Sequence, residues 1–193
     1  MSEVTLEING REVKAQEGVT VLEAAKSVGI EIPTLCYHEK LEPYGGCRIC
    51  CVEVKAGERT RIVPACTYPV ADGLVVNTES EKVVAARRML LELLMTRAPT
   101  VKKVQDLAHQ YGVERSRFEA APSFCVLCGL CVRYCDEVKK KNAVTFVGRG
   151  VDREIMFVPE IAAKECPPCQ ECFELCPTGV LKPTFLLSQA LTC

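Results

Sequence analysis

Eight cysteines stand in two runs whose spacing suits iron–sulfur chemistry. Each run places three cysteines at steps of three residues and a fourth after three more residues. The first run contains Cys125, Cys128, Cys131 and Cys135, and the second contains Cys166, Cys169, Cys172 and Cys176. A short loop with a thiolate at every third residue can wrap three corners of one cubane, while the fourth thiolate points away and reaches another cluster. The spacing therefore predicts two 4Fe-4S sites that exchange ligands.

This exchange assigns each cysteine to one cluster. The first 4Fe-4S cluster is expected to take Cys125, Cys128, Cys131 and Cys176, and the second to take Cys135, Cys166, Cys169 and Cys172. The pattern is that of a bacterial two-cluster ferredoxin, in which a proline follows the fourth cysteine. Pro177 fits, whereas Asp136 departs from the pattern. Because proline shapes the chain exit and is not a ligand, we interpret Asp136 as a tolerated departure.

Zinc and disulfides are the structural alternatives for these runs. Zinc usually takes cysteines as separated C-x2-C pairs or together with histidines. Neither alternative explains two matched copies of the same run. The only histidines are His38 and His109, and we interpret His109 as a surface or packing residue of a helix and not as a ligand.

Four further cysteines predict a third site. Cys36, Cys47, Cys50 and Cys66 have ten, two and fifteen residues between them. Closely spaced cysteines followed by a distant one are typical of 2Fe-2S sites of the plant type, where the first gap is four residues. Gly45 and Gly46 would let the backbone approach the cluster closely. Cys51 is expected to be a buried thiol and not a ligand, and Cys193 a free one.

The elements around this third site predict a β-grasp domain. A hairpin over residues 4–14 has a strong Asn-Gly turn signal at its centre. A helix over residues 21–28 follows, with Thr20 as its N-cap and Glu23 as the capping-box partner. Residues 73–78 predict the closing strand of the sheet.

A long amphipathic helix is predicted after the β-grasp domain. Thr78 or Ser80 can cap it, and it breaks near Ala98-Pro99. Its apolar face is expected to carry Val83, Val84, Met89, Leu90, Leu93 and Leu94. The basic pair Arg87-Arg88 is interpreted as part of a solvated face.

The remaining elements are short. A second helix over residues 100–112 leads into a polar linker over residues 114–122, and a hairpin over residues 143–158 separates the two cysteine runs. The tail, residues 183–193, is expected to form one helical turn or two. Its apolar side chains, which we expect to cover a partner, are Phe185, Leu186, Leu187 and Leu191.

Composition limits the class of protein. The chain has 193 residues, fourteen cysteines and a net charge of −1 with both signs mixed, which gives no electrostatic footprint for nucleic acid. Residues 1–10 are polar and lack the apolar core of a signal peptide, so the cytoplasm or another reducing compartment is expected. The apolar run at residues 89–95 is interrupted by Glu92 and falls far below the ~20 residues that span a bilayer. We therefore expect no membrane span.

These elements give an α+β fold class with three parts. Residues 1–78 form a β-grasp 2Fe-2S ferredoxin domain, and residues 79–121 form a helical connector. Residues 122–193 form a bacterial-type two-cluster 4Fe-4S ferredoxin domain with an inserted hairpin and a tail. The expected cofactors are therefore one 2Fe-2S and two 4Fe-4S clusters.

The chain resembles the iron–sulfur subunit of soluble NAD(P)-linked hydrogenases, including electron-bifurcating ones. That subunit is similar to the N-terminal regions of the complex I large iron–sulfur subunit and of iron-only hydrogenases. The segments that carry the resemblance are Thr34–His38, Gly45–Cys50, Pro64–Cys66, Arg87–Arg97 and the two four-cysteine runs. Many relatives hold a further 4Fe-4S cluster with a histidine and three cysteines just after Arg97. Here no cysteine lies between Cys66 and Cys125, so that cluster is expected to be absent.

The resemblance implies an electron relay between a flavoprotein NAD(P)-binding partner and a hydrogenase partner. The equivalent subunit of an NAD-linked formate dehydrogenase, or of another bifurcating oxidoreductase, remains an alternative that the sequence does not separate. No Gly-rich nucleotide loop follows a strand, so the nucleotide and flavin sites are expected in partners and no catalytic residue is assigned here. Alternatives from other classes are an iron–sulfur redox sensor and a zinc-stapled interaction module. The near-neutral charge and the lack of a helix-turn-helix pattern disfavour the sensor.

Overall fold

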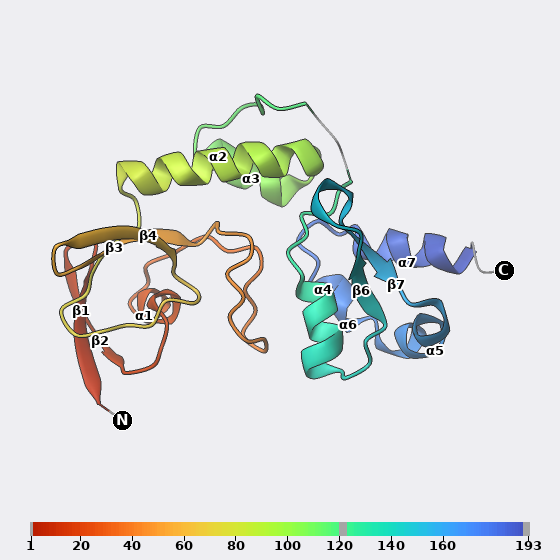
Figure 1. Cartoon of the computed structure of the whole chain (residues 1–193), viewed down its shortest axis with the longest axis horizontal. Coiled ribbons are helices and arrows are strands. Elements are labelled where there is room, and N and C mark those ends of the chain that lie inside the picture. Colours follow the sequence, from red (N-terminus) through yellow and green to blue (C-terminus); the bar gives the residue numbers. More distant parts are fainter. Residues whose placement is uncertain (1, 120–122, 191–193) are drawn as a thin grey trace. The chain divides into compact units, whose positions relative to one another are not determined.

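The computed structural model describes residues 2–119 and 123–190, and its contacts divide the chain into two compact units (Figure 1). Unit 1 contains Met1–Tyr37, Pro43–Leu91 and Tyr111–Val113. Unit 2 contains His38–Glu42, Glu92–Gln110 and Glu114–Cys193. Each unit therefore combines segments that lie far apart in the sequence.

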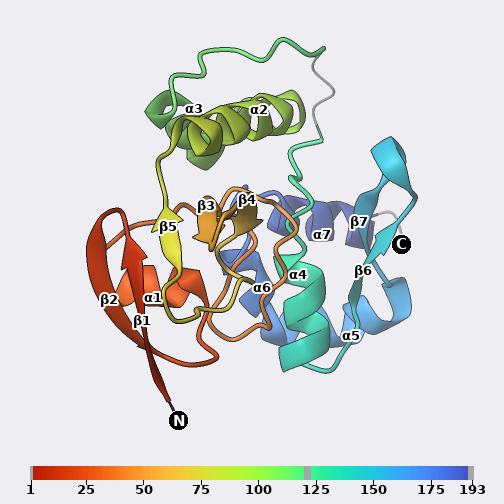
Figure 2. The same ribbon diagram turned by 60° about the vertical axis from the view of Figure 1, so that its left-hand side comes forward.

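Unit 1 is built on a five-stranded sheet in the order β2-β1-β5-β3-β4 (Figure 2). Its strands are β1 (Glu3–Ile8), β2 (Arg11–Gln16), β3 (Cys51–Ala56), β4 (Arg59–Pro64) and β5 (Val75–Asn77). β1 and β5 pair in parallel, whereas the other three pairs are antiparallel. The predicted N-terminal hairpin and closing strand are confirmed. The β3–β4 hairpin adds two strands that the sequence analysis did not assign.

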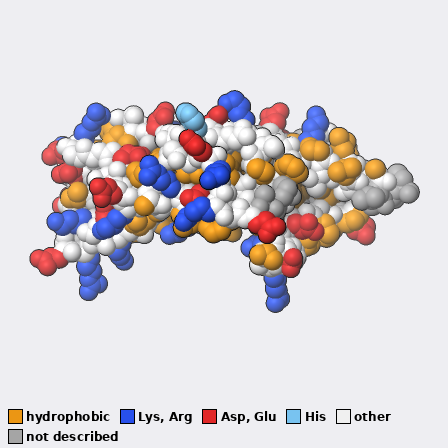
Figure 3. All heavy atoms as spheres, turned by 90° about the horizontal axis from the view of Figure 1, so that it is seen from above, with side chains coloured by type: hydrophobic (Ala, Val, Ile, Leu, Met, Phe, Trp, Pro, Cys, Tyr) orange, Lys and Arg blue, Asp and Glu red, His pale blue; other side chains and the backbone are white. Residues whose placement is uncertain are grey.

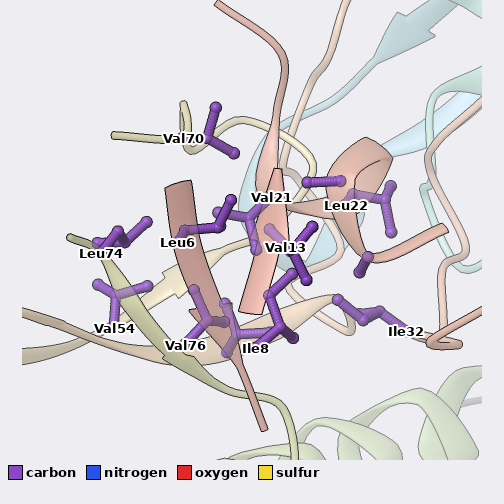
Figure 4. Packing of buried hydrophobic residues seen from close by; sticks show 14 of the residues in the cluster. Leu6, Ile8, Val13, Val21, Leu22, Ile32, Val54, Val70, Leu74 and Val76 are labelled. Carbon is purple, nitrogen blue, oxygen red and sulfur yellow. The ribbon is translucent and has the colours of Figure 1, made fainter. Parts of the chain in front are cut away.

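Helix α1 (Val21–Ser27) packs against this sheet and encloses the core. Its capping box forms as predicted: the Thr20 hydroxyl accepts from the Glu23 N–H at 3.3 Å, and the Glu23 carboxylate accepts from the Thr20 N–H at 2.8 Å. Apolar side chains from the helix, the strands and the loops point toward one another in Figure 4. The labelled members of this cluster are Leu6, Ile8, Val13, Val21, Leu22, Ile32, Val54, Val70, Leu74 and Val76.

Helix α2 (Glu81–Arg97) forms where it was predicted, but its buried face differs in part from the predicted one. The Ser80 hydroxyl accepts from the Val83 N–H at 3.4 Å, so Ser80 acts as the cap. The buried side chains of the helix are Val83, Arg87 and Leu91, which recur every four residues. Of the predicted apolar face, Val83 is buried and Val84, Leu90 and Leu94 are half-buried, but Met89 and Leu93 are exposed, so the prediction is wrong at these two positions. The prediction that Arg87 lies on a solvated face of the helix is also wrong, because its guanidinium is buried and has hydrogen-bond partners inside unit 1.

Unit 2 contains a second, smaller sheet and several short helices. The strands β6 (Val144–Val147) and β7 (Glu154–Phe157) pair antiparallel, which confirms the predicted hairpin. The helices are α3 (Lys102–Gln110), α4 (Leu130–Arg133), the π-helix η1 (Tyr134–Val138), the 3-10 helix η2 (Gly150–Asp152), α5 (Pro159–Cys169), α6 (Glu171–Glu174) and α7 (Leu181–Ala190). The predicted second helix is thus confirmed as α3. The linker has no helix or strand over residues 114–119, and residues 120–122 lie outside the described part.

The tail forms a longer helix than the predicted turn or two. On α7, Leu186 and Leu187 are exposed, but Phe185 is buried. The Phe185 ring lies 5.1 Å from the Phe157 ring, so this side chain belongs to the core of unit 2 and does not cover a partner. Leu191 and Cys193 lie outside the described residues.

The surface carries both signs of charge. Basic and acidic side chains are mixed over the face drawn in Figure 3, as the net charge of −1 indicates. Within residues 2–119 and 123–190, every helix is too short or too polar to cross a bilayer.

We expect Ile8→Ala to lower the free energy of unfolding of unit 1 by about 2–5 kcal/mol, because Ile8 is fully buried at the β1–β5 pair. Ile62→Ala makes the same chemical change on the edge strand β4, where the side chain is 38% exposed, and should cost less than about 1 kcal/mol. Native-state hydrogen exchange of the β1 and β5 amides measures both values. Equal losses in the two variants would contradict the assigned core.

Candidate iron–sulfur centres

Four cysteines converge within unit 1. The backbone N–H of Cys47 donates to the Cys36 sulfur at 3.4 Å, and the Cys50 thiol donates to the Cys66 sulfur, also at 3.4 Å. Cys36, Cys50 and Cys66 are buried and Cys47 is half-buried. Cys66 also interacts electrostatically with Cys36 and Cys47, so the structure brings together all four cysteines of the predicted 2Fe-2S set. Cys51 is buried beside them, as predicted.

The β3–β4 hairpin delivers the distant member of this set. β3 begins directly after Cys50, and β4 ends two residues before Cys66. The register pairs Cys51 with Pro64, and the Ala65 N–H donates to the Cys50 carbonyl at 3.0 Å. Because a hairpin register fixes which residues lie opposite each other, these two strands bring Cys66 back to Cys50 across fifteen intervening residues.

Hydrogen bonds to sulfur set the electrostatics of this group. The hydrogen bond from Cys50 is the main cause that lowers the pKa of the Cys66 thiol, and the Gly45 N–H lowers it further. The hydrogen bond with Cys36 lowers the pKa of Cys47 to about 6, assisted by the N–H groups of Ile49, Leu35 and Cys36. Gly45 has φ +66°, and a Cβ there would lie 3.2 Å from Thr67. Glycine therefore suits this close approach of backbone to sulfur.

Unit 2 contains a cavity that four cysteines line. These are Cys125, Cys128, Cys131 and Cys176. The loop between the first three turns through Leu127 and Gly129, whose φ values are +52° and +76°, and the Leu127 N–H donates to the Cys125 sulfur at 3.4 Å. α4 then begins at Leu130 and carries Cys131. Cys176 comes from the segment that follows α6.

A second cavity in unit 2 is lined by the other four cysteines. These are Cys135, Cys166, Cys169 and Cys172. Cys166 and Cys169 lie in the last turn of α5, the chain reverses at Gln170 with φ +52°, and Cys172 lies on α6. Cys135 belongs to the π-helix, and the Ala143 N–H donates to its sulfur at 3.2 Å. Both cavities thus group the cysteines in the predicted sets, with the last cysteine of each run beside the other run.

The π-helix explains why Asp136 replaces the expected proline. The chain stays helical after Cys135 and continues to Val138, so Asp136 lies inside a helical segment. Proline inside a helix lacks an N–H and clashes with the preceding turn. Pro177, by contrast, follows the end of α6 at Glu174. Short π-helical segments are frequent at functional sites.

The donor set of these cavities fits iron–sulfur clusters. Burial raises the pKa of Cys125 and of Cys131, and it raises the pKa of Cys166 to about 11 and of Cys172 to about 12. Such thiols become ligands only where a metal compensates for the loss of the proton. Among the described residues, no group of three or more His, Cys, Asp or Glu side chains is arranged to hold a single metal ion. His109 is exposed on α3.

Two arginines of α2 contact the cysteine segments, and neither was predicted from the sequence to belong to a site. In unit 2, the Arg97 Nε donates to the Cys125 carbonyl at 3.2 Å, and the Arg97 carbonyl accepts from the N–H groups of Ser123 and Phe124. In unit 1, Arg87 donates to the carbonyls of Ile49 and Cys51. The only sequence signal was the helical register of Arg87, which stands four residues from both Val83 and Leu91.

Family models match both cysteine-bearing regions. Residues 1–81 match a 2Fe-2S iron-sulfur cluster binding domain, and residues 124–180 match a 4Fe-4S dicluster domain. The chain therefore has one 2Fe-2S domain and a domain for two 4Fe-4S clusters, and the predicted fold class and cofactors are confirmed.

Curated relatives cover nearly the whole chain. The NADPH-Fe(3+) oxidoreductase subunit alpha of Geobacter sulfurreducens is 33% identical over 92% of this chain and 24% of its own length. The NADP-reducing hydrogenase subunit HndD of Solidesulfovibrio fructosivorans is 32% identical over 94% of this chain and 36% of its own length. The NADH-ubiquinone oxidoreductase 75 kDa subunit of Reclinomonas americana is 32% identical over 92% of this chain and 29% of its own length. The chain thus spans between 24% and 36% of these relatives.

A solved structure is similar over most of both chains. A chain of the NAD+-reducing NiFe-hydrogenase in the H2-reduced state matches with a TM-score of 0.71 and 31% identity, over 81% of this chain and 76% of that one. This likeness and the two domain matches confirm the resemblance that the cysteine motifs predicted. The chain belongs to the family of iron–sulfur subunits that includes those of NAD(P)-linked hydrogenases and the corresponding region of the complex I 75 kDa subunit.

Proposed function

We propose that this chain is a relay subunit that moves single electrons between a flavin- and NAD(P)-binding partner and a hydrogenase partner in a multi-subunit oxidoreductase. The observation that carries the proposal is the presence of three four-cysteine groups in one chain of this family. When bound, each cluster supplies one-electron redox chemistry, and a plant-type 2Fe-2S centre typically has a potential of about −400 mV. That potential suits exchange with pyridine nucleotides, ferredoxin or hydrogen.

The cysteine groups are the proposed ligand sets. We assign the 2Fe-2S cluster to Cys36, Cys47, Cys50 and Cys66. We assign the first 4Fe-4S cluster to Cys125, Cys128, Cys131 and Cys176, and the second to Cys135, Cys166, Cys169 and Cys172. Support comes from the convergence of the cysteines in unit 1 and from the two cavities of unit 2, each of which is lined by one of these sets.

The protein around these sulfurs would tune electron transfer. Backbone N–H groups donate to the sulfurs of Cys36, Cys125 and Cys135, and such bonds stabilise negative charge on a ligand. Burial of most of the cysteines limits access of water. Hydrogen bonds to sulfur and solvent exposure are two of the factors that set cluster potentials.

Partners would perform the chemistry of the substrates. We propose that the β-grasp domain, residues 1–78, docks on the flavoprotein and that residues 122–193 face the second partner, with residues 79–121 as connector. The names of the relatives, an NADP-reducing hydrogenase subunit and an NAD+-reducing hydrogenase, favour a hydrogenase over a formate dehydrogenase. A reducing compartment such as the cytoplasm suits the complex, because cluster ligands must remain reduced thiols.

Cluster content is the first test. Anaerobically purified protein should contain about ten iron atoms and about ten acid-labile sulfides per chain, as one 2Fe-2S and two 4Fe-4S clusters require. Elemental analysis and a sulfide assay measure both values. Values near fourteen would reveal a cluster that we have not assigned, and substantial zinc would contradict the assignment.

The exchange of ligands between the two runs has a separate test. We expect Cys176→Ala to damage the cluster at Cys125, Cys128 and Cys131 more than the one at Cys166, Cys169 and Cys172, because Cys176 lines the first cavity. Electron paramagnetic resonance of the reduced protein resolves the two signals. Cys135→Ala should instead damage the cluster at Cys166, Cys169 and Cys172 more. Cys51→Ala should leave both 4Fe-4S clusters intact. Loss of only the neighbouring cluster in Cys176→Ala would overturn the assignment.

The relay itself is tested in the complex reconstituted with its flavoprotein and distal partner. Cys47→Ala should abolish electron flow through the 2Fe-2S centre and leave both 4Fe-4S clusters reducible by dithionite, because Cys47 belongs only to the group in unit 1. Cys51→Ala, a buried thiol outside the proposed ligand set, is the matched control and should retain the full rate. An unchanged rate from NAD(P)H to the distal partner in Cys47→Ala would make the 2Fe-2S centre a side branch.

A further inference from the structure

Arg87 is a fully buried cation beside the cysteine group of unit 1. Its side chain has 0% exposure and is the largest fully buried side chain among the described residues. Its Nε donates to the Ile49 carbonyl at 3.2 Å, and its Nη2 donates to the Cys51 carbonyl at 2.8 Å. Ile49 and Cys51 are the residues immediately before and after Cys50. One planar guanidinium therefore holds the backbone on both sides of a proposed cluster ligand.

Further side chains surround the guanidinium. Its Nη1 donates to the Glu79 carboxylate at 2.7 Å and to the Tyr111 hydroxyl at 2.6 Å. The Tyr111 ring also lies 5.3 Å from the guanidinium carbon. The Glu79 side chain is 54% exposed, so solvent screens its negative charge far more than it screens the buried positive charge. The Cys51 thiol also hydrogen-bonds the guanidinium. All three nitrogens of the cation are thus hydrogen-bonded, but its charge is only partly neutralised.

Stability alone is a weak reason for such an arrangement. Burying a charge is costly, and replacing a buried ion pair with apolar side chains of similar volume is often neutral or stabilising. Val83 and Leu91 occupy the equivalent positions one turn before and one turn after Arg87, so an apolar residue would continue the buried face of α2. Arginine, unlike lysine, keeps its charge in a buried site and presents a rigid fork of donors.

We propose that Arg87 is a positioning residue of the 2Fe-2S centre, which fixes the Cys50 segment and raises the reduction potential of the centre with a permanent buried positive charge. The inference rests on the proposed ligand set of unit 1. One-electron reduction of the centre, with the electron taken from the reductant of the titration, adds one negative charge to the site and transfers no proton. A nearby cation stabilises the reduced form more than the oxidised form. Because the protein interior screens charge only weakly, the buried cation can still stabilise the reduced centre.

The test is a potentiometric titration of the full, cluster-loaded chain and its variants, monitored by the resonance of the reduced 2Fe-2S centre. Arg87→Gln keeps donors but removes the charge, and it should lower the potential. At a fixed solution potential, we expect the ratio of reduced to oxidised centre to fall on the order of tenfold. This corresponds to about 59 mV for a one-electron couple. The 4Fe-4S signals in the same sample are the internal reference and should not move.

Three matched variants separate charge from geometry. Arg87→Lys removes the fork and, at a pH low enough to keep the buried ammonium protonated, retains the positive charge, so under that condition it should recover most of the potential while altering the line shape of the signal. Glu79→Gln removes the opposing carboxylate and should shift the potential upward. Arg88→Gln makes the same change at the next residue of α2, whose side chain is exposed and bonds the Tyr111 carbonyl, and it should leave the potential unchanged.

The outcomes distinguish the inference from the function on which it rests. An intact 2Fe-2S signal at unchanged potential in Arg87→Gln overturns the inference alone. If Arg87→Gln does not assemble the cluster, Glu79→Gln decides, and an unchanged potential in that variant overturns the inference. Absence of a 2Fe-2S signal in the unmodified chain would overturn the proposed ligand set and the inference together.

Discussion

Each cysteine group depends on a sulfur atom that its own short loop cannot supply. In unit 1, the register of β3 and β4 returns Cys66 to Cys50, so the antiparallel hairpin is the element that completes the group. In unit 2, Cys176 lines the cavity of the first run and Cys135 lines that of the second. Neither run therefore completes a four-sulfur group alone. The β6–β7 hairpin lies between the two runs along the chain, and α5 carries the first two cysteines of the second run.

Electrostatics impose the second requirement. Burial raises the pKa of several of these thiols, so the protein must supply groups that favour negative charge on sulfur. Backbone N–H groups at positive-φ turns do this in the short loops. Arg87 binds the carbonyl of Cys51, next to Cys50, and Arg97 binds the carbonyl of Cys125. The carbonyl contacts hold the cysteine segments in place, while the positive charges favour the electron-rich state of a bound centre. The same side chains can therefore contribute to both structure and redox potential.

Local interactions explain what the sequence predicted well. The Asn9-Gly10 turn and the capping box of α1 depend on residues within a few positions, and cysteine spacing reflects the geometry of a cluster, so each could be predicted without the fold. The burial of Arg87 could not, because its partners come from three separate segments, Ile49–Cys51, Glu79 and Tyr111. A charged residue on a helix is ordinarily expected in solvent, and only tertiary contacts reverse that expectation. The π-helix at Cys135 likewise could not be predicted, because no periodic pattern in the sequence indicates it.

The central claim is that three iron–sulfur clusters bind where the cysteines converge, with the fourth ligand of each 4Fe-4S cluster drawn from the other run. Anomalous diffraction at the iron edge from crystals of the anaerobically purified chain tests it most directly. The account predicts three iron-containing sites, with the Cys176 sulfur bonded to the cluster at Cys125–Cys131 and the Cys135 sulfur bonded to the cluster at Cys166–Cys172. Cys176 bonded to the cluster of its own run, or iron bound between Cys66 and Cys125, would contradict the account.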